Sequence, residues 1–105
     1  MYQRTGKLTI GNGDATGLIQ RIHDDLLPLI EAASGFIAYT AVKIDDQTAI
    51  TTRLFRDFSS MDAEAQSTQQ TDSAISNDFQ LTVEPIVDGE VNTGAASELT
   101  EVFQP

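Results

Sequence analysis

The stretch Phe36–Phe55, FIAYTAVKIDDQTAITTRLF, decides the fold of this chain of 105 residues. Its two halves, Phe36–Ile44 and Thr48–Phe55, are rich in aromatic and β-branched residues, and the polar residues 45–47 lie between them. Two such runs that are separated by a short polar turn predict an antiparallel β-hairpin. The alternation of side chains along the hairpin predicts that Tyr39 lies on one face of the sheet and Phe36 on the other.

A helix is predicted on each side of this hairpin. Before it, apolar residues recur at steps of three and four from Leu18 to Ala33, which is the pattern of an amphipathic helix, with Asp14 or Thr16 as its N-cap. Pro28 removes a backbone donor inside this helix and predicts a kink or a local break, and Gly35 supplies the turn that ends it. After the hairpin, a second helix of poor apolar content is predicted from about residue 60 to 77, beginning at Ser59 or Ser60.

A strand is predicted at each end of the domain. Residues 2–10 alternate in polarity, and residues 79–91 contain a second apolar run, in which Pro85 demands an edge position, a bulge or a late start of the strand. The order β-α-β-β-α-β predicts a ferredoxin-like α+β fold, with an antiparallel four-stranded sheet and two helices on one face. We expect one domain over residues 1–92. The remaining tail, residues 93–105, contains three apolar anchors and is predicted to dock on a partner subunit.

The net charge of the chain limits the classes of partner that it is expected to bind. Sixteen acidic residues against six basic ones give a net charge of −10, and threonine is abundant while lysine is scarce. Such a surface repels phosphate backbones and anionic membranes, so neither nucleic acid nor a membrane is an expected partner. The balance favours a halophilic host, in whose concentrated salt surface repulsion is screened. The alternative is an acidic protein of an ordinary mesophile.

The residue types that the chain lacks, and the spacing of those it has, exclude several kinds of site. The chain has no cysteine, which removes disulfides, thiolate metal sites and cysteine nucleophiles. It has neither an apolar leader nor a run of about 18 apolar residues, which predicts a soluble cytoplasmic protein without a signal peptide. Neither Asp24-Asp25 nor Asp45-Asp46 has the arrangement of a metal site, since neighbouring helical residues diverge and the second pair suits a turn. The glycines of residues 11–17 do not fit the spacing of a dinucleotide-binding loop.

Three short motifs within this order resemble those of the antibiotic biosynthesis monooxygenase (ABM) family. They are Gly35-Phe36 at the start of the second strand, Phe55-Arg56-Asp57 after the third strand, and residues 85–91, PIVDGEV, in the fourth. The resemblance covers residues 2–92. It implies a dimeric α+β barrel in which two sheets pack face to face, with a pocket between the helices and the sheet of each subunit.

The resemblance also implies an activity. Some members of the family oxidise aromatic polyketides or quinols with molecular oxygen and no metal or flavin cofactor, others degrade haem, and many have no known activity. Haem degradation is disfavoured here, because Phe55 stands where that branch commonly has tryptophan, the chain has no tryptophan, and its one histidine lies on the first helix. The predicted function is therefore cofactor-independent monooxygenation of an aromatic or quinol-type molecule. The alternative is a non-catalytic dimeric binding or structural module of the same fold.

Three residues are candidates for catalysis, and each has a plainer interpretation. His23 could move a proton near neutral pH if it faces the pocket, or it could be a half-exposed residue paired with a neighbouring aspartate. Arg53 could stabilise a substrate anion, or it could belong to an ion pair with one of the sixteen carboxylates. Tyr39, which with Thr40 lies mid-strand, could act as an acid or could simply pack. The pocket is predicted to be lined by Ile22, Leu26, Phe55 and Ile75.

The hairpin also predicts a homodimer. Two helices can cover only one face of a four-stranded sheet, so the other face must meet solvent or a partner. The hairpin residues Ile37, Tyr39 and Ala41 are predicted on one face and Phe36, Ala38 and Val42 on the other. Both sets are too apolar for open water. A second copy of the chain is therefore expected on the open face.

Overall fold

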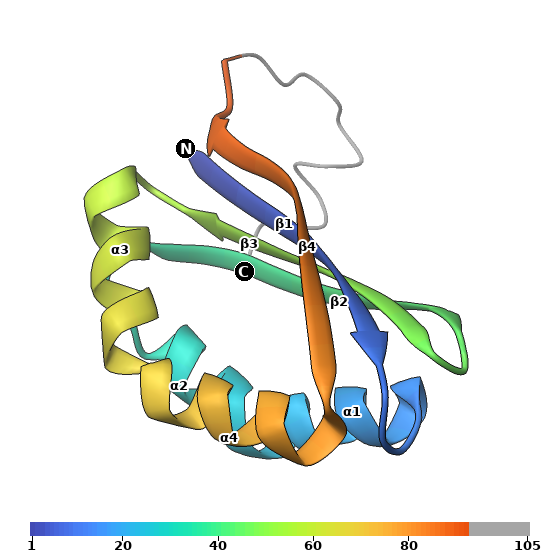
Figure 1. The fold of residues 1–105 in the computed structure, drawn as a ribbon. Helices are drawn as coiled ribbons and strands as arrows, with labels where there is room; N and C mark the ends of the chain where they lie inside the picture. Colours follow the sequence, from blue (N-terminus) through green and yellow to red (C-terminus); the bar gives the residue numbers. More distant parts are fainter. Residues whose placement is uncertain (93–105) are drawn as a thin grey trace.

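The computed structural model describes residues 1–92 and consists of one antiparallel sheet with helices packed against it (Figure 1). The strands are β1 (Tyr2–Ile10), β2 (Phe36–Asp45), β3 (Thr48–Phe55) and β4 (Leu81–Glu90), in the spatial order β2-β3-β1-β4. Every neighbouring pair is antiparallel. This is the ferredoxin-like α+β fold, so the fold class predicted from the hairpin and its flanking helices is confirmed. The predicted tail lies outside the described residues.

The first helical segment is interrupted where proline predicts an interruption. It consists of α1 (Ala15–Arg21), the π-helix η1 (Ile22–Leu26) and α2 (Leu27–Glu31). Pro28 lies in the first turn of α2, where a missing N–H costs least, and the Leu27 N–H reaches back to the Ile22 carbonyl in the wider π pattern. The predicted break is therefore confirmed. The helix starts at Asp14, whose carboxylate accepts a 2.8 Å hydrogen bond from the Gly17 N–H.

The second helical segment also has two parts, α3 (Phe58–Ser67) and α4 (Gln69–Phe79), which meet at Thr68. Its start differs from the prediction of Ser59 or Ser60. Asp57 is the N-cap, since its backbone is extended and its carboxylate accepts a 2.8 Å hydrogen bond from the Ser60 N–H. An aspartate two residues upstream thus competes successfully with the serines for the free amides.

Strand β4 accommodates Pro85 in two of the three predicted ways. It is an edge strand, paired only with β1 among the described strands. The register shifts between Thr5, which pairs with Val87, and Gly6, which pairs with Pro85, so that Ile86 is the extra residue of a β-bulge. The prediction of an edge position or a bulge is confirmed, because a proline cannot donate to a second neighbouring strand.

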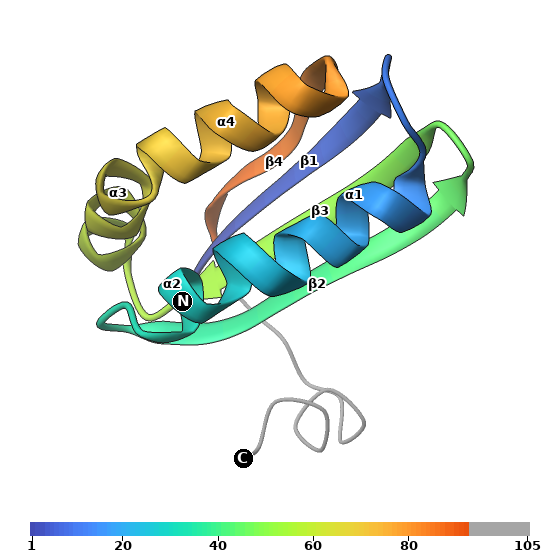
Figure 2. The same ribbon diagram turned by 90° about the horizontal axis from the view of Figure 1, so that it is seen from below.

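The helices all lie over one face of the sheet, and the core fills the space between the two layers (Figure 2). A second bulge changes one predicted face. Ile37 is the extra residue between Phe36, which pairs with Phe55, and Ala38, which pairs with Leu54. Phe36 therefore packs against the same core as Tyr39, and the prediction that these two residues face opposite sides is wrong. The fully or almost fully buried apolar side chains are Ile10, Ala15, Leu18, Leu26, Ile30, Ala49, Phe55, Met61 and Ile75.

The opposite face of the sheet is not featureless. A hollow of about 220 Å³ is lined there by residues from β1, β2 and β3 and by the two ends of the described chain, namely Met1, Gln3, Ala38, Thr40, Thr52, Leu54 and Val91. Val42, which also points to this face, is 51% exposed. The face therefore mixes small apolar residues with threonines.

Candidate functional site

A cavity of about 400 Å³ lies between the helices and the sheet. Its floor consists of sheet residues, and its roof and walls come from η1, α3 and α4. The floor residues are Arg4, Gly6, Leu8, Tyr39, Thr51, Arg53, Leu81 and Val83. The roof and wall residues are Ile22, Leu26, Ala65, Asp72, Ser73, Ile75 and Ser76. The volume is in the range of pockets that hold small organic ligands, and most of the lining side chains are apolar.

The structure brings most of the predicted pocket residues to this cavity. Ile22 and Leu26 reach it from the π-helix, and Ile75 reaches it from α4. Phe55 does not line it. The ring of Phe55 is fully buried in the core next to the cavity, where it packs edge-to-face on Phe36 with 5.9 Å between the ring centroids. Phe55 thus supports the end of β3.

The three predicted catalytic residues do not lie together. Tyr39 on β2 and Arg53 on β3 are register partners, and both line the cavity. The side chain of His23 is 70% exposed, and its Nδ1 lies 3.2 Å from the Asp24 carboxylate. His23 therefore lies on the outer surface of η1 beside an aspartate, as in the second of its two interpretations, and does not face the cavity. Thr40 points to the opposite face of the sheet.

Arg53 has carboxylate partners from two helices. Its Nη1 lies 3.0 Å from each carboxylate oxygen of Glu64, and its Nη2 lies 3.1 Å from Oδ1 of Asp72. The side chain of Glu64 is fully buried, whereas that of Arg53 is 16% exposed and that of Asp72 is 38% exposed. The ion pair that the sequence offered as the alternative role for Arg53 is therefore present. A buried carboxylate of this kind is tolerated because a cation and hydrogen bonds compensate its charge.

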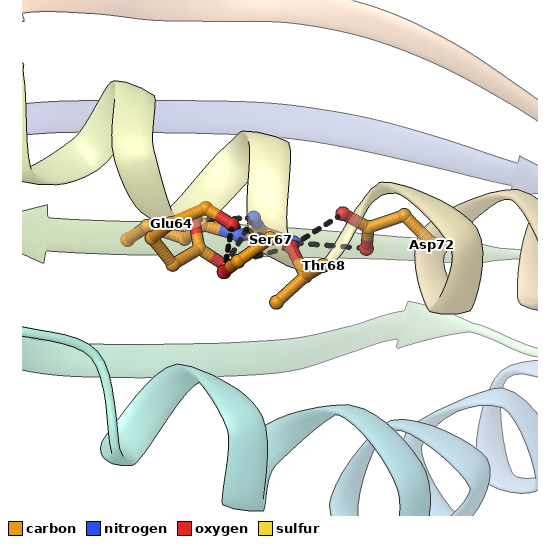
Figure 3. A network of polar contacts seen from close by, with 5 residues as sticks. Glu64, Ser67, Thr68 and Asp72 are labelled. Carbon is orange, nitrogen blue, oxygen red and sulfur yellow. Dashed lines mark hydrogen bonds and ion pairs between the residues drawn. The ribbon is translucent and has the colours of Figure 1, made fainter.

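Thr68 connects the two carboxylates at the junction between α3 and α4 (Figure 3). Its hydroxyl lies 3.1 Å from Oε1 of Glu64, 3.2 Å from Oδ2 of Asp72 and 3.0 Å from the backbone carbonyl of Glu64. A hydroxyl has one hydrogen to donate, so these three acceptors share it. The helix break thus lies at the site, where two acidic residues contact one guanidinium and share the hydroxyl of Thr68.

Burial and charge affect the two ionisable side chains on the cavity floor in different ways. Burial raises the pKa of the Tyr39 phenol to about 12, although the positive charge of Arg53 opposes the shift. Tyr39 is therefore a neutral hydroxyl at physiological pH, and the Arg53 guanidinium lies 5.9 Å from the centre of its ring. Burial alone would lower the pKa of Arg53, but the carboxylates of Asp72 and Glu64 outweigh it and raise the pKa. Arg53 is a permanent cation.

A second charged group borders the cavity at Arg4. Its Nε lies 3.1 Å from the Asp88 carboxylate on β4, which also accepts a short hydrogen bond from the Tyr2 hydroxyl. The hydrogen bond from Tyr2 and the contact with Arg4 lower the pKa of Asp88. This trio is much more exposed than the Arg53 cluster, so its charges are better screened.

The sequence did not identify Glu64, Thr68 and Asp72 as site residues. A signal was present in the spacing. These three residues recur every four positions, on the helical stripe that begins at the buried Met61 and ends at the buried Ile75. Polar residues at inward positions of an otherwise apolar stripe indicate a buried polar cluster. Because the helix has few apolar residues, this inward-facing stripe was difficult to recognise in the sequence.

The described residues bear on metals and membranes as well. Within residues 1–92, no three histidine, cysteine, aspartate or glutamate side chains are grouped so that they could hold a metal ion. Over the same range, the helices are too short and too polar for any of them to span a bilayer.

Solved structures share this architecture at very low sequence identity. SnoaB of Streptomyces nogalater, a cofactor-independent oxygenase, matches with a TM-score of 0.67 and 10% identity, over 88% of this chain and 94% of SnoaB. A Deinococcus radiodurans protein assigned as an antibiotic biosynthesis monooxygenase matches with a TM-score of 0.65 and 15% identity, over 91% of this chain and 100% of that protein. The chain has the fold of the antibiotic biosynthesis monooxygenases. The resemblance predicted from the three motifs is confirmed at this level.

A third solved structure with this fold is of a protein described as dimeric. A dimeric ferredoxin-like protein from an uncultured marine organism matches with a TM-score of 0.68 and 7% identity, over 91% of this chain and 99% of that protein. No family model and no curated protein matches this sequence. The likeness to the ABM proteins therefore rests on the fold, since identities of 7 to 15% say little about individual side chains.

Proposed function

We propose that this chain is a cofactor-independent monooxygenase of the ABM type, which oxidises a small aromatic or quinol molecule in the cavity over Tyr39 and Arg53. The observation that supports this most is the cavity itself, whose volume of about 400 Å³ suits a ligand of two or three fused rings. It lies in a fold shared with a cofactor-independent oxygenase.

The chemistry assigns limited tasks to the protein. In the oxidation of an anthrone-type methylene by O₂, the substrate supplies the electrons. One oxygen atom becomes the new carbonyl, and the other leaves as water with the two methylene hydrogens. The side chains then bind, orient and exclude water. Ile22, Leu26 and Ile75 cover the rings, and the neutral Tyr39 hydroxyl donates a hydrogen bond to a substrate oxygen.

Oxygen uptake tests this proposal. Anthrone and a simple quinol are supplied in concentrated KCl, and oxygen consumption is followed together with product formation. We expect one O₂ consumed per anthrone oxidised, and a rate at least about tenfold lower in Tyr39→Phe, since one hydrogen bond to the reacting oxygen is lost.

Gln70→Ala on the exposed surface of α4 serves as the control. His23→Ala tests the role that the sequence suggested for His23, and its exposed position predicts the wild-type rate. Absence of uptake over a broad panel of phenols and quinols would refute the enzyme.

The second candidate function is a binding module of the same fold without a reaction. It is favoured by the state of Arg53, whose two terminal nitrogens are already engaged by carboxylates and so offer little to a substrate anion. The two functions are distinguished by one comparison. Saturable binding of the aromatic panel without any oxygen uptake would favour the module.

The setting of the protein is also a proposal. We propose a homodimer that joins through the open sheet face, in the cytoplasm of a salt-tolerant host. The dimeric ferredoxin-like neighbour supports self-association, and the hollow lined by Ala38, Thr52 and Leu54 gives the open face a shape that a partner could fill. Residues 93–105 are proposed to dock on the partner subunit.

A further inference from the structure

The charges around the cavity are unequal, and they indicate which ligands it can accept. Among the described residues, the charged side chains that line it are Arg4, Arg53 and Asp72. Their ion-pair partners add the carboxylates of Glu64 and Asp88. Two guanidinium groups thus face three carboxylates, which leaves one negative charge in excess. An anionic ligand would enter against this excess in an environment where charges are poorly screened.

Asp72 is the carboxylate of this set that a ligand in the cavity can reach. Glu64 is completely buried behind it, and Asp88 is held at the rim by Arg4 and Tyr2. Asp72 lines the cavity, and its side chain is 38% exposed. Its Oδ1 accepts a hydrogen bond from Arg53, and its Oδ2 accepts one from the shared Thr68 hydroxyl. Each carboxylate oxygen can accept two hydrogen bonds, so acceptor capacity remains. The guanidinium and the hydroxyl hold the carboxylate in place.

We propose that Asp72 determines the specificity of the cavity: it accepts a hydrogen bond from the hydroxyl of a neutral phenol-type ligand, and the excess negative charge rejects ligands that bear a carboxylate or phosphate. This rests on the proposed function only in using the same cavity. Of the two roles that the sequence offered for Arg53, it retains the ion pair. The guanidinium positions Asp72 and does not itself receive a substrate anion.

The test compares three ligands of nearly equal size on the intact protein. They are 2-naphthol, 2-methoxynaphthalene, in which the hydroxyl is capped, and 2-naphthoate, which is an anion at neutral pH. Affinities are measured by equilibrium dialysis at moderate and at high KCl. We expect the wild type to bind 2-naphthol at least about tenfold more tightly than either of the others. This difference corresponds to the binding free energy that one charge-assisted hydrogen bond contributes. Comparable affinity for 2-naphthoate and 2-naphthol would overturn the proposal without any variant.

A charge-removing variant makes the test specific to Asp72. Asp72→Asn keeps the shape and removes the negative charge. It should weaken 2-naphthol binding and raise the affinity for 2-naphthoate by about tenfold. Asp62→Asn is the matched control, because it removes one exposed carboxylate from α3 outside the cavity lining. It should leave all three affinities unchanged. An equal response of both variants would attribute the preference to net charge alone and contradict the role of Asp72.

The location of binding and the independence from catalysis need their own readouts. Backbone amide shifts on titration should move near Ala65 and Asp72 and stay constant near Val42 on the open face, and the reverse pattern would overturn the proposal. Oxygen uptake is measured separately. A phenol preference without oxygen uptake would refute the monooxygenase alone, whereas oxidation of anthrone with equal binding of 2-naphthoate would refute the role of Asp72 alone.

Discussion

Nη1 of Arg53 on β3 lies 3.0 Å from both carboxylate oxygens of Glu64 on α3, and no part of the Glu64 side chain reaches solvent. This pair fastens the second helical segment to the sheet. Removal of the cation should be costly, because it leaves a buried carboxylate without compensation.

Arg53→Met is therefore expected to lower the free energy of unfolding by about 3 to 5 kcal/mol. Glu64→Gln should cost less, about 1 to 3 kcal/mol, since Asp72 still pairs with the guanidinium. Urea denaturation in a fixed salt concentration measures both values. Lys43→Met, which removes an exposed ion pair with Asp46, is the control and should cost less than about 1 kcal/mol. A cost for Arg53→Met equal to that of the control would show that the buried pair adds nothing.

The raised pKa of Tyr39 predicts an alkaline limit to stability. The folded state holds the phenolic proton up to a pKa of about 12, whereas the unfolded chain releases it near 10.0. The stabilisation is therefore complete below about pH 10 and is lost as the pH rises toward 12. Absorbance at alkaline pH should show a tyrosine that titrates late, together with loss of structure. The hydrogen bond to Asp88 also raises the pKa of Tyr2, the other tyrosine of the chain. Tyr39→Phe should therefore remove only the titration near pH 12 and flatten the fall in stability between pH 10 and 12, and an unchanged titration curve would contradict the assignment.

Two glycines offer a matched pair for the turn that enters the hairpin. Gly35 has a φ of +80°, and a Cβ at this position would lie 2.4 Å from Oγ of Ser60. Gly35→Ala should lower the free energy of unfolding by about 2 kcal/mol or more, through backbone strain and steric overlap. Gly89→Ala meets no atom within 4 Å and should change stability by less than about 0.5 kcal/mol. Equal effects of the two substitutions in thermal melts would be inconsistent with the strained turn.

The open face of the sheet predicts the oligomeric state. Thr40 is exposed there and lines the hollow with Leu54. We expect sedimentation velocity to show a dimer at micromolar concentration in high salt, and Thr40→Glu to shift it toward monomer by placing a charge in the interface. Gln70→Glu adds the same charge on the exposed side of α4 and should leave the dimer intact. A wild-type monomer under these conditions would refute the interface.

The net charge of −10 predicts a dependence on salt. When KCl rises from about 0.1 to about 1 M, the Debye length falls from about 10 to about 3 Å, so that repulsion between surface carboxylates weakens. The melting temperature should rise by more than about 5 °C, which corresponds to roughly 1 kcal/mol for a domain of this size. Full stability at low salt would favour the alternative of an acidic protein from a mesophile.

The elements of the fold could be predicted from the sequence because their signals are local. The alternation along β3, the turn at Asp45-Asp46 and the helical period of the first segment depend on residues only a few positions apart. Pro28 and Pro85 likewise marked the break and the bulge, since a missing N–H has the same effect wherever the chain folds. Even here, the N-cap was displaced to Asp57, because several polar side chains competed for the same free amides.

The candidate site could be predicted only in part from such local patterns. Of the residues that the sequence proposed, Tyr39, Arg53, Ile22, Leu26 and Ile75 lie at the cavity, because strand and helix periods fix which side chains face inward, whereas Phe55 is buried beside it. The sequence could not show that Ile37 would bulge and return Phe36 to the core, since a bulge depends on the register between two strands. It also left Glu64 and Asp72 outside the site.

The sequence by itself thus determined the order of the elements and the sheet that they form, whereas the face of that sheet on which the cavity lies came from the tertiary structure. Only the tertiary structure decided the state of Arg53. Its partners lie 11 and 19 residues away along the chain, on two helices separated by a break, and no local period specifies which carboxylates a buried guanidinium will bind. The pairing follows from burial, because a cation shielded from water must take the nearest anions that the packed helices present.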